Sequence, residues 1–171
     1  MKIVQAKQEH IPTVFGLLSA CMRTMRNNGI DQWDDIYPNE EFVMKDANDR
    51  SLYVLEENNL CIGAVSLNQE QDVAYQQVNW LGGEPVLVVH RLCVHPNYQG
   101  TGLGSRLMDF AEEHAKRNAY ASIRLDAYTG NPTAFGMYER RGYRKAGQVY
   151  FPRRTLPFFC FEKILATNSA P

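Results

Sequence analysis

The stretch RLCVHPNYQGTGLGSRLMDFAEEHA, residues 91–115, decides the fold, because a strand pattern passes into a helix pattern through a glycine-rich loop. Residues 86–94 form an apolar run typical of a buried strand, and residues 102–117 carry apolar side chains at helical spacing. The first amides of a helix lack intrahelical partners, the helix dipole is positive there, and glycine lets a bulky phosphate approach the backbone. The loop therefore indicates a phosphate-bearing ligand; a strand-to-helix turn softened by glycine is the alternative.

The spacing of Gly100, Gly102 and Gly104 discriminates among phosphate-binding motifs. A dinucleotide-binding fingerprint needs G-x-G-x-x-G near the start of a βαβ unit, whereas this motif reads G-x-G-x-G in mid-chain. A nucleotide-hydrolysing P-loop needs G-x-x-x-x-G-K-[ST], which the sequence lacks. Both hydride transfer and nucleotide hydrolysis are therefore disfavoured.

Outside this stretch, the sequence predicts strands that first pair as neighbours and then alternate with helices, which indicates a mixed α+β fold. A polar turn at residues 57–59 joins two apolar runs and predicts a hairpin. Residues 68–85 show no clear pattern. The predicted strands cover residues 2–6, 51–57, 60–67, 86–94, 121–128, 143–151 and 156–164, and the predicted helices cover residues 8–26, 102–117 and 132–141, with a further short helix after the loop at 29–41.

The composition bounds the possible functions. With 171 residues and 44% hydrophobic content, a single domain over residues 1–165 is expected, followed by a flexible tail at 166–171. The net charge of −1 gives no general attraction to nucleic acid or to membranes. The cysteines have no metal-ligand spacing, so no metal site and no disulfide framework are expected, and the absence of an apolar signal core favours a cytoplasmic location.

Two segments together carry a family resemblance. RLCVHPNYQGTGLG, followed by LDAYTGNPTAFGMYERRGYRKAG, resembles the GNAT superfamily of acetyl-CoA-dependent N-acyltransferases. The pyrophosphate loop of that family, [QR]-x-x-G-x-[GA], is matched by Gln99, Gly102 and Gly104. The resemblance implies a mixed, mostly antiparallel sheet of six to seven strands flanked by helices, with a V-shaped splay between the fourth and fifth strands.

The resemblance also implies a cofactor site for acetyl-CoA. In the family, backbone groups of the fourth strand face the pantetheine arm and the acetyl group, the loop amides hold the pyrophosphate, and an asparagine before a later helix contacts the cofactor. The corresponding residues are Leu92, Cys93, Val94, Gln99, Gly100, Thr101, Gly102, Leu103, Gly104 and Asn131.

Tyr138 is the candidate general acid. Asn131 and Pro132 form a good helix start and Gly142 a good stop, so Tyr138 lies two turns after the cap on the same side of a bounded helix. A tyrosine with a pKa of about 10 is protonated at neutral pH and can donate its proton. The family tyrosine at this place protonates the departing thiolate; a core tyrosine with a satisfied hydroxyl is the alternative.

A primary alkylamine has a pKa of about 10.4, so the acceptor must lose a proton before it attacks. His90, on the strand before the loop, is the leading candidate base because a histidine of ordinary pKa suits this task. Glu84 at the mouth of the same strand and an ordered water are the alternatives. Strand alternation places His90 on the side of Val88 and Leu92, but the bulge common in this family's strand would change that side.

A backbone amide at Cys93 or Val94 could stabilise the oxyanion, so that no side chain is needed for that role. Cys93 also raises the possibility of an acetyl-cysteine intermediate. Direct attack of the amine is favoured, because the sequence shows no partner that would make this thiol a thiolate.

The acceptor site is expected at the loop over residues 29–41, which joins the first two helices. Trp33 and Tyr37 could wall an amine pocket, and acidic residues of the loop could attract a cation; packing on the core and a solvated turn are the alternatives. The expected reaction is therefore acetylation of a small-molecule primary amine. A protein amino terminus or lysine is the alternative acceptor, a non-catalytic acyl-CoA-binding module is the alternative function, and a homodimer is expected from its frequency in the family.

Overall fold

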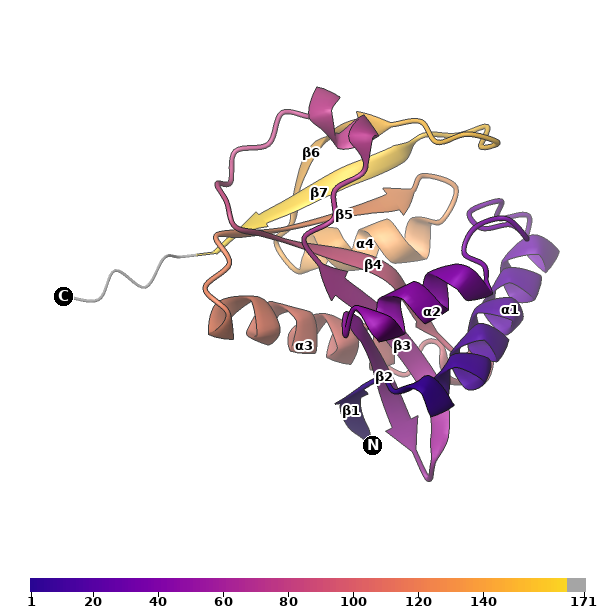
Figure 1. The fold of residues 1–171 in the computed structure, drawn as a ribbon. Helices are drawn as coiled ribbons and strands as arrows, with labels where there is room; N and C mark the ends of the chain where they lie inside the picture. The colour runs from indigo at the N-terminus through magenta and orange to yellow at the C-terminus, as the bar shows by residue number, and fades with distance from the viewer. Residues whose placement is uncertain (166–171) are drawn as a thin grey trace. The chain divides into compact units, whose positions relative to one another are not determined.

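The computed structural model describes residues 1–165 and has the expected α+β architecture (Figure 1). The strands are β1 (Lys2–Gln5), β2 (Leu52–Glu57), β3 (Leu60–Asn68), β4 (Val86–Val94), β5 (Ser122–Tyr128), β6 (Arg144–Val149) and β7 (Phe158–Ile164). The helices are α1 (Ile11–Asn27), α2 (Glu40–Asn48), α3 (Leu103–Arg117) and α4 (Pro132–Arg140), with short 3-10 helices η1 (Gln8–His10), η2 (Val73–Gln77) and η3 (Pro96–Tyr98).

The seven strands follow the order β1-β2-β3-β4-β5-β7-β6. The pairs β1–β2, β2–β3, β5–β7 and β6–β7 are antiparallel, whereas β4 and β5 are parallel. The prediction of a mixed, mostly antiparallel sheet is therefore confirmed. The parallel register joins Val86–Val88 to Ser122–Arg124, and both strands continue beyond it. The V-shaped splay that the resemblance implies for those continuations stays a prediction.

Several predicted boundaries shift for local reasons. The first predicted helix is divided into η1 and α1, and Pro12 lies in the first turn of α1, where the missing amide of proline costs no hydrogen bond. The hairpin between β2 and β3 turns at Asn58 and Asn59, which both have positive φ, as a tight two-residue turn requires. The last two strands are shorter than predicted because the segment between them contains Pro152 and Pro157, which cannot donate to a strand ladder.

The chain forms two compact units, and each is described by itself. The first unit comprises Met1–Leu67 and His90–Ala111, and the second comprises Asn68–Val89 and Glu112–Pro171. Because the boundaries fall within β4 and α3, each of these elements contributes residues to both units. The prediction of a single domain over residues 1–165 stays a prediction, and the predicted tail at 166–171 lies outside the described residues.

The first unit is a three-layer arrangement around its strands. On one face, α1 and α2 lie side by side and bury a cluster that includes Leu18, Val43 and Ala64 (Figure 1). On the other face, α3 brings the ring of Phe110 to 4.9 Å from that of Tyr53. Both faces of these strands are therefore apolar, which explains why they read as nearly continuous hydrophobic runs.

The second unit buries β5 and β7 between α4 and the segment Asn68–Pro85. The Tyr138 ring of α4 lies 5.8 Å from Phe161, which is the strand partner of Leu125. On the opposite face, Arg124 lies under Trp80 of the Asn68–Pro85 segment, 4.5 Å from the ring centroid. This segment therefore has a definite place, although its sequence shows no periodic pattern.

No helix within residues 1–165 combines the length and the apolar character needed to cross a membrane. Over the same residues, no group of three or more histidine, cysteine, aspartate or glutamate side chains is arranged to hold a metal ion.

Candidate functional site

The glycine loop of the first unit has the backbone that its sequence predicts. Gly100 and Gly102 adopt φ values of 77° and 87°, a left-handed conformation that other residues rarely adopt. A Cβ built at either glycine meets no heavy atom of the described residues within 4 Å apart from chain neighbours, so the space beside the loop is open. The amides of the first turn of α3, which begins at Leu103, have no intrahelical acceptors and favour an anion. These features fit a phosphate-bearing group.

Side-chain hydrogen bonds fix the path of the loop. Gln99 donates from Nε2 to the carbonyl oxygen of Val94 at 2.9 Å, and Cys21 donates from Sγ to the same oxygen at 3.3 Å. Thr101 donates from Oγ1 to the carbonyl of Tyr98 at 2.6 Å. The side chains of Gln99 and Thr101 therefore stabilise the path of the loop. The contacts that we predict between these two residues and a cofactor involve their backbone amides.

Strand β4 carries a local irregularity at Arg91. Its φ of 49° is left-handed, although it lies in the middle of a strand. Such a residue interrupts the regular alternation of side chains between the two faces of the sheet. His90, Arg91 and Leu92 are half-buried, whereas Cys93 and Val94 are buried. Alternation alone therefore does not fix the side on which His90 lies, and the expected bulge stays a prediction.

The two candidate bases differ in their surroundings. His90 belongs to the first unit and is half-buried. Glu84 belongs to the second unit, where its carboxylate accepts hydrogen bonds from the Val86 amide at 3.0 Å and from Gln71 Nε2 at 3.4 Å. Glu84 therefore caps the start of β4, and the base assignment to His90 stays a prediction.

A buried ion pair holds the Arg91 side chain. Its Nε and Nη2 donate to the two carboxylate oxygens of Asp46 on α2 at 2.8 and 2.7 Å, and its Nη1 donates to the Tyr37 hydroxyl at 3.0 Å. Ser66 donates a further hydrogen bond to Asp46. Burial alone lowers the pKa of Arg91, but Tyr37 and Asp46 outweigh it and raise the pKa, so the guanidinium stays charged.

The two predicted acceptor-site aromatic residues have different positions in the first unit. Trp33 is 7% exposed and belongs to the hydrophobic core cluster. Tyr37 is half-buried, bonds Arg91 and meets the ring of Phe42 edge-on at 4.9 Å. Trp33 therefore packs in the core, and Tyr37 has a hydrogen-bond partner and a ring partner within the fold. The role of both residues in binding an amine stays a prediction.

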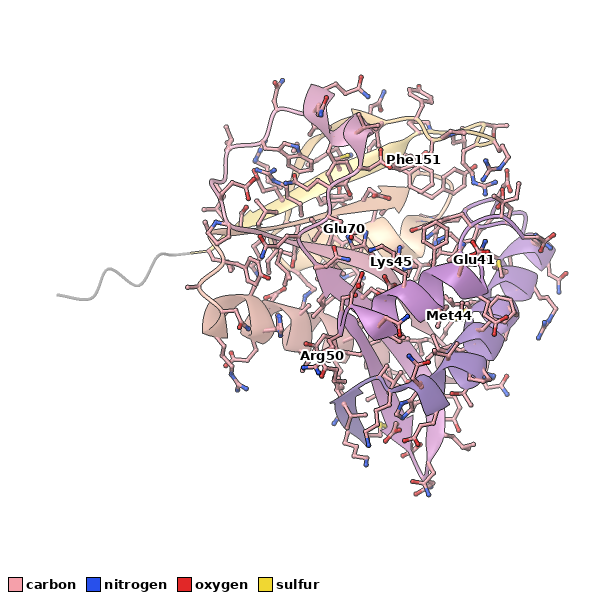
Figure 2. All side chains as sticks on the ribbon, viewed as in Figure 1. Glu41, Met44, Lys45, Arg50, Glu70 and Phe151 are labelled. Atoms are coloured by element: carbon pink, nitrogen blue, oxygen red, sulfur yellow. The ribbon has the colours of Figure 1, made fainter. Side chains whose placement is uncertain are left out.

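The acidic residues of the same loop also have structural partners. Asp34 accepts hydrogen bonds from the amides of Ile36 and Tyr37 at 2.9 and 2.8 Å, and Asp35 pairs with Arg26 at 3.0 Å. Glu40 and Glu41 lie in the first turn of α2, where acidic residues favour the helix dipole (Figure 2 labels Glu41). Asp34 and Asp35 therefore have partners within the fold, and the expectation that acidic residues of this loop attract a cation stays a prediction.

Cys93 is a buried thiol and not an activated nucleophile. The neighbouring Cys21 thiol and burial raise the pKa of Cys93 well above its ordinary value. A protonated thiol is a poor nucleophile, so this environment favours direct attack by an amine over an acetyl-cysteine intermediate.

The second unit contains Asn131 and Tyr138. Asn131 caps α4 by accepting a hydrogen bond from the Ala134 amide at 3.4 Å, and Gly142 ends the helix with a φ of 80°, as predicted. Tyr138 is 7% exposed, and burial, aided by the charge of Asp126, raises its pKa. Its hydroxyl is therefore fully protonated at neutral pH, as a proton donor must be.

Two polar pairs were not predicted from the sequence. Arg91 and Asp46 meet in the first unit, and Tyr75 donates to Asp126 at 2.6 Å in the second. A sequence signal for these pairs was nevertheless present, because a charged residue stands within an apolar strand. These residues are Arg91 in VLVVHRLCV and Asp126 in SIRLDAY. Such a residue indicates a buried partner, although it does not indicate which one.

Comparison with known proteins agrees with this arrangement. The acetyltransferase (GNAT) family model matches residues 14–143. The uncharacterised N-acetyltransferase YesJ of Bacillus subtilis is 24% identical over 146 residues, which cover 83% of this chain and 81% of that protein.

Solved structures share the fold. A GNAT-family acetyltransferase from Streptococcus agalactiae has a TM-score of 0.78 at 20% identity and covers 96% of this chain and 95% of its own. Salmonella typhimurium yncA, solved with its cofactor acetyl-CoA, has a TM-score of 0.72 at 17% identity, with 100% of this chain and 97% of its own covered.

Proposed function

The chain belongs to the acetyltransferase (GNAT) family, and from that premise we propose that it transfers the acetyl group of acetyl-CoA to a small-molecule primary amine in the cytoplasm. The observation that carries the proposal is the loop before α3. Its two left-handed glycines, the open space beside them and the amides of the helix start form a backbone site suited to a pyrophosphate. The acetyl-CoA bound by the fold neighbour yncA supports the choice of cofactor.

Backbone groups supply most of the proposed cofactor contacts. The amides of residues 99–104 bind the pyrophosphate, the backbone of Leu92–Val94 binds the pantetheine arm, and Asn131 adds a contact from the start of α4. Bound acetyl-CoA supplies an activated thioester. A backbone amide of Cys93 or Val94 donates to the carbonyl oxygen as negative charge develops there.

The side chains of this proposal handle protons. His90, or a water in its place, removes a proton from the acceptor ammonium, because only the neutral amine attacks the thioester carbon. Tyr138 donates its hydroxyl proton to the sulfur as the carbon–sulfur bond breaks. Its raised pKa supports this role, because the phenol keeps its proton at neutral pH.

The alternative is an acyl-CoA-binding module without catalysis, and Tyr138→Phe separates it from an enzyme. We expect the turnover number with a primary amine to fall by at least about 100-fold, because a positioned acid contributes about 10²–10⁴. The dissociation constant of acetyl-CoA should stay unchanged. Thiol release monitors turnover across a panel of small amines and lysine peptides, and calorimetry measures binding.

Tyr150→Phe is the matched control, because Tyr150 is 62% exposed and belongs to the same unit. It should change neither quantity. Undiminished turnover in Tyr138→Phe would remove Tyr138 from the mechanism, and a preference for lysine peptides over small amines would assign a protein acceptor.

A further inference from the structure

Arg91 has a strained backbone conformation inside β4. Its φ of 49° is left-handed, which costs a residue with a side chain about 1–2 kcal/mol. Within residues 1–165, every other non-glycine residue of positive φ lies in a turn, so Arg91 alone has this conformation inside a strand or helix. Such strain persists only where the surrounding structure enforces it, and it is concentrated at functional sites. It therefore needs a structural cause, and it suggests a function.

The contacts of the Arg91 side chain can enforce this conformation. Both carboxylate oxygens of Asp46 accept hydrogen bonds from the guanidinium, at 2.8 and 2.7 Å, and the Tyr37 hydroxyl accepts a third at 3.0 Å. The side chains of Arg91 and Asp46 are 9% and 3% exposed. A planar guanidinium in such a bidentate pair has a fixed direction. Asp46 and Tyr37 therefore hold the Arg91 side chain in one orientation, which limits the backbone torsions of Arg91.

The two partners of Arg91 are themselves held in place. Ser66 of β3, which is 0% exposed, donates a hydrogen bond to Asp46. The backbone before α2 forms a closed turn, in which the Asp34 amide donates to the Tyr37 carbonyl at 2.9 Å and the Tyr37 amide donates to the Asp34 carboxylate at 2.8 Å. The contacts of Arg91 thus join β4 to α2, β3 and the loop at 29–41, all within the first unit.

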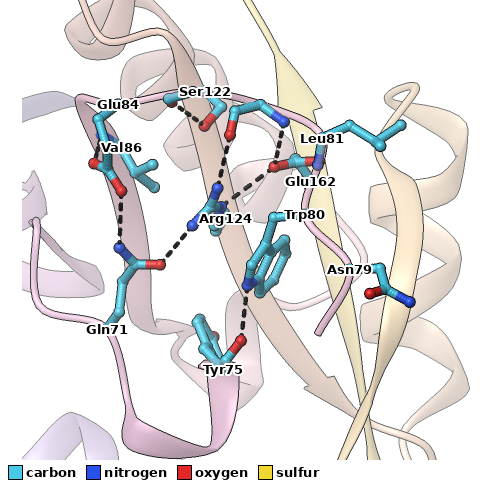
Figure 3. Close-up of polar contacts among 12 residues, drawn as sticks. Gln71, Tyr75, Asn79, Trp80, Leu81, Glu84, Val86, Ser122, Arg124 and Glu162 are labelled. Atoms are coloured by element: carbon cyan, nitrogen blue, oxygen red, sulfur yellow. Dashed lines mark hydrogen bonds and ion pairs between the residues drawn. The ribbon is translucent and has the colours of Figure 1, made fainter. Parts of the chain in front are cut away.

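A second buried arginine shows that an ion pair does not by itself require strain (Figure 3). In the second unit, Arg124 of β5 donates to Glu162 at 3.2 Å and to the Gly82 carbonyl at 2.9 Å. The side chains of Arg124 and Glu162 are 7% and 0% exposed. Arg124 is nevertheless not among the residues of positive φ, and it pairs with Glu162 in a regular register. Burial of a charged pair therefore does not explain the conformation of Arg91.

The strained residue stands between the groups that the proposed reaction needs on β4. His90, the candidate base, precedes it, and Leu92–Val94, whose backbone we assign to the pantetheine arm and the oxyanion, follow it. An ordinary strand residue has a φ of about −120 to −140°. Relaxation of Arg91 from 49° to such a value would rotate His90 relative to Leu92–Val94. A displacement of about 1 Å in a catalytic site can cost about 100-fold in rate.

We propose that Arg91 is a positioning residue for the acetyl transfer and that Asp46 and Tyr37 fix its left-handed turn. The turn sets the direction of His90 relative to the backbone of Leu92–Val94. In this role Arg91 acts through the backbone of β4 and not by contact with a substrate, and Tyr37 acts through its hydroxyl. This inference rests on the proposed function.

Arg91→Lys separates positioning from stability. Lysine keeps a positive charge beside Asp46 but lacks the planar fork that binds two carboxylate oxygens and the Tyr37 hydroxyl together. At saturating acetyl-CoA, we expect kcat with the best primary alkylamine of a panel to fall by about 10- to 100-fold, with KM for the amine within about threefold of wild type. Tm should fall less than in Asp46→Asn, because the charge pair remains. Tyr37→Phe should lower kcat by about 3- to 10-fold, because Asp46 still holds the guanidinium.

Two controls break similar contacts that do not involve Arg91. Glu162→Gln removes the charge of the other buried carboxylate, so it should lower Tm and leave kcat within about threefold of wild type. Arg26→Gln removes an exposed ion pair of 3.0 Å with Asp35, in the loop that also carries Tyr37, and should change neither quantity. All rates are measured at a temperature at which circular dichroism shows every variant to be folded.

A wild-type kcat in Arg91→Lys would overturn the proposal. Equal losses of kcat in Arg91→Lys and Glu162→Gln would show a general effect of lost stability and would also overturn it. If Glu162→Gln does not fold, Arg26→Gln is the comparison, and if Arg91→Lys does not fold, Tyr37→Phe against Arg26→Gln decides. A wild-type protein that acetyl-CoA does not stabilise, or that acetylates no amine, would refute the proposed function itself. The wild-type measurements thus separate the two failures.

Discussion

Replacing Asp46 by asparagine should destabilise the first unit far more than an ordinary surface change. The side chains of Asp46 and Arg91 are 3% and 9% exposed, and two hydrogen bonds of 2.8 and 2.7 Å join them. Asp46→Asn keeps the shape of the side chain but leaves the Arg91 guanidinium buried without its counter-charge. Removing one member of a buried ion pair costs about 3–5 kcal/mol.

The same helix provides a matched control. Lys45 and Asp49 form a pair at 2.8 Å, but their side chains are 47% and 52% exposed, and such a pair contributes about 0.3–0.5 kcal/mol (Figure 2 labels Lys45). In a chain of 171 residues, 1 kcal/mol corresponds to about 2–4 °C in Tm. We therefore expect Asp46→Asn to lower Tm by about 6–20 °C and Asp49→Asn to lower it by about 2 °C or less.

Urea unfolding monitored by circular dichroism measures the free energy of unfolding of both variants. The comparison is valid when the slope m is the same for both. Because Arg91 directly precedes the residues that we assign to the pantetheine arm, Asp46→Asn should also weaken acetyl-CoA binding, whereas Asp49→Asn should not. A loss of less than about 1 kcal/mol in Asp46→Asn would show that the ion pair contributes little to the stability of the first unit and would refute this reasoning.

The remaining predictions concern the glycine loop, the stability of the protein in acid and the Cys93 thiol. Gly102→Ala imposes about 1–2 kcal/mol of backbone strain at a φ of 87° and should weaken acetyl-CoA binding about tenfold by calorimetry; unchanged affinity would contradict the role of the loop. Burial raises the pKa of Glu162, but the amide and arginine hydrogen bonds outweigh it and lower the pKa. The unfolded chain therefore binds more protons in acid, and the free energy of unfolding should fall as the pH drops below about 4.5, less steeply in Glu162→Gln. Cys93→Ala should keep thiol release within about tenfold of wild type, whereas loss of a covalent nucleophile would abolish it.

The sequence predicts those parts of the fold whose signals are local. The bounds of β4, residues 86–94, agree with the structure, and the start of α3 agrees to within one residue, because an apolar run, a glycine loop and an amphipathic pattern follow one another directly. The hairpin turn at Asn58 and Asn59 was similarly predictable, since asparagine tolerates positive φ. The glycine loop belongs to this group, and with it the candidate cofactor site.

The unpredicted features depend on partners that are distant in the chain. Arg91 adopts a left-handed conformation while bound to Asp46, 45 residues earlier, and Asp126 meets Tyr75, 51 residues earlier. No local pattern selects such partners, because burial of a charge requires a counter-group and does not specify its position in the sequence. Asp34 and Asp35 of the loop at 29–41 depend on partners in the same way, because their hydrogen bonds and ion pair within the fold could not be read from the local sequence.

The central claim is that the loop before α3 binds acetyl-CoA, and thermal unfolding with acetyl-CoA, NAD and ATP tests it most directly. A ligand at 100 times its dissociation constant stabilises by about 2.7 kcal/mol, which corresponds to about 5–11 °C in Tm for a chain of this length. We expect that shift with acetyl-CoA alone. A shift with NAD or ATP instead, or with none of the three, would contradict the acetyltransferase account.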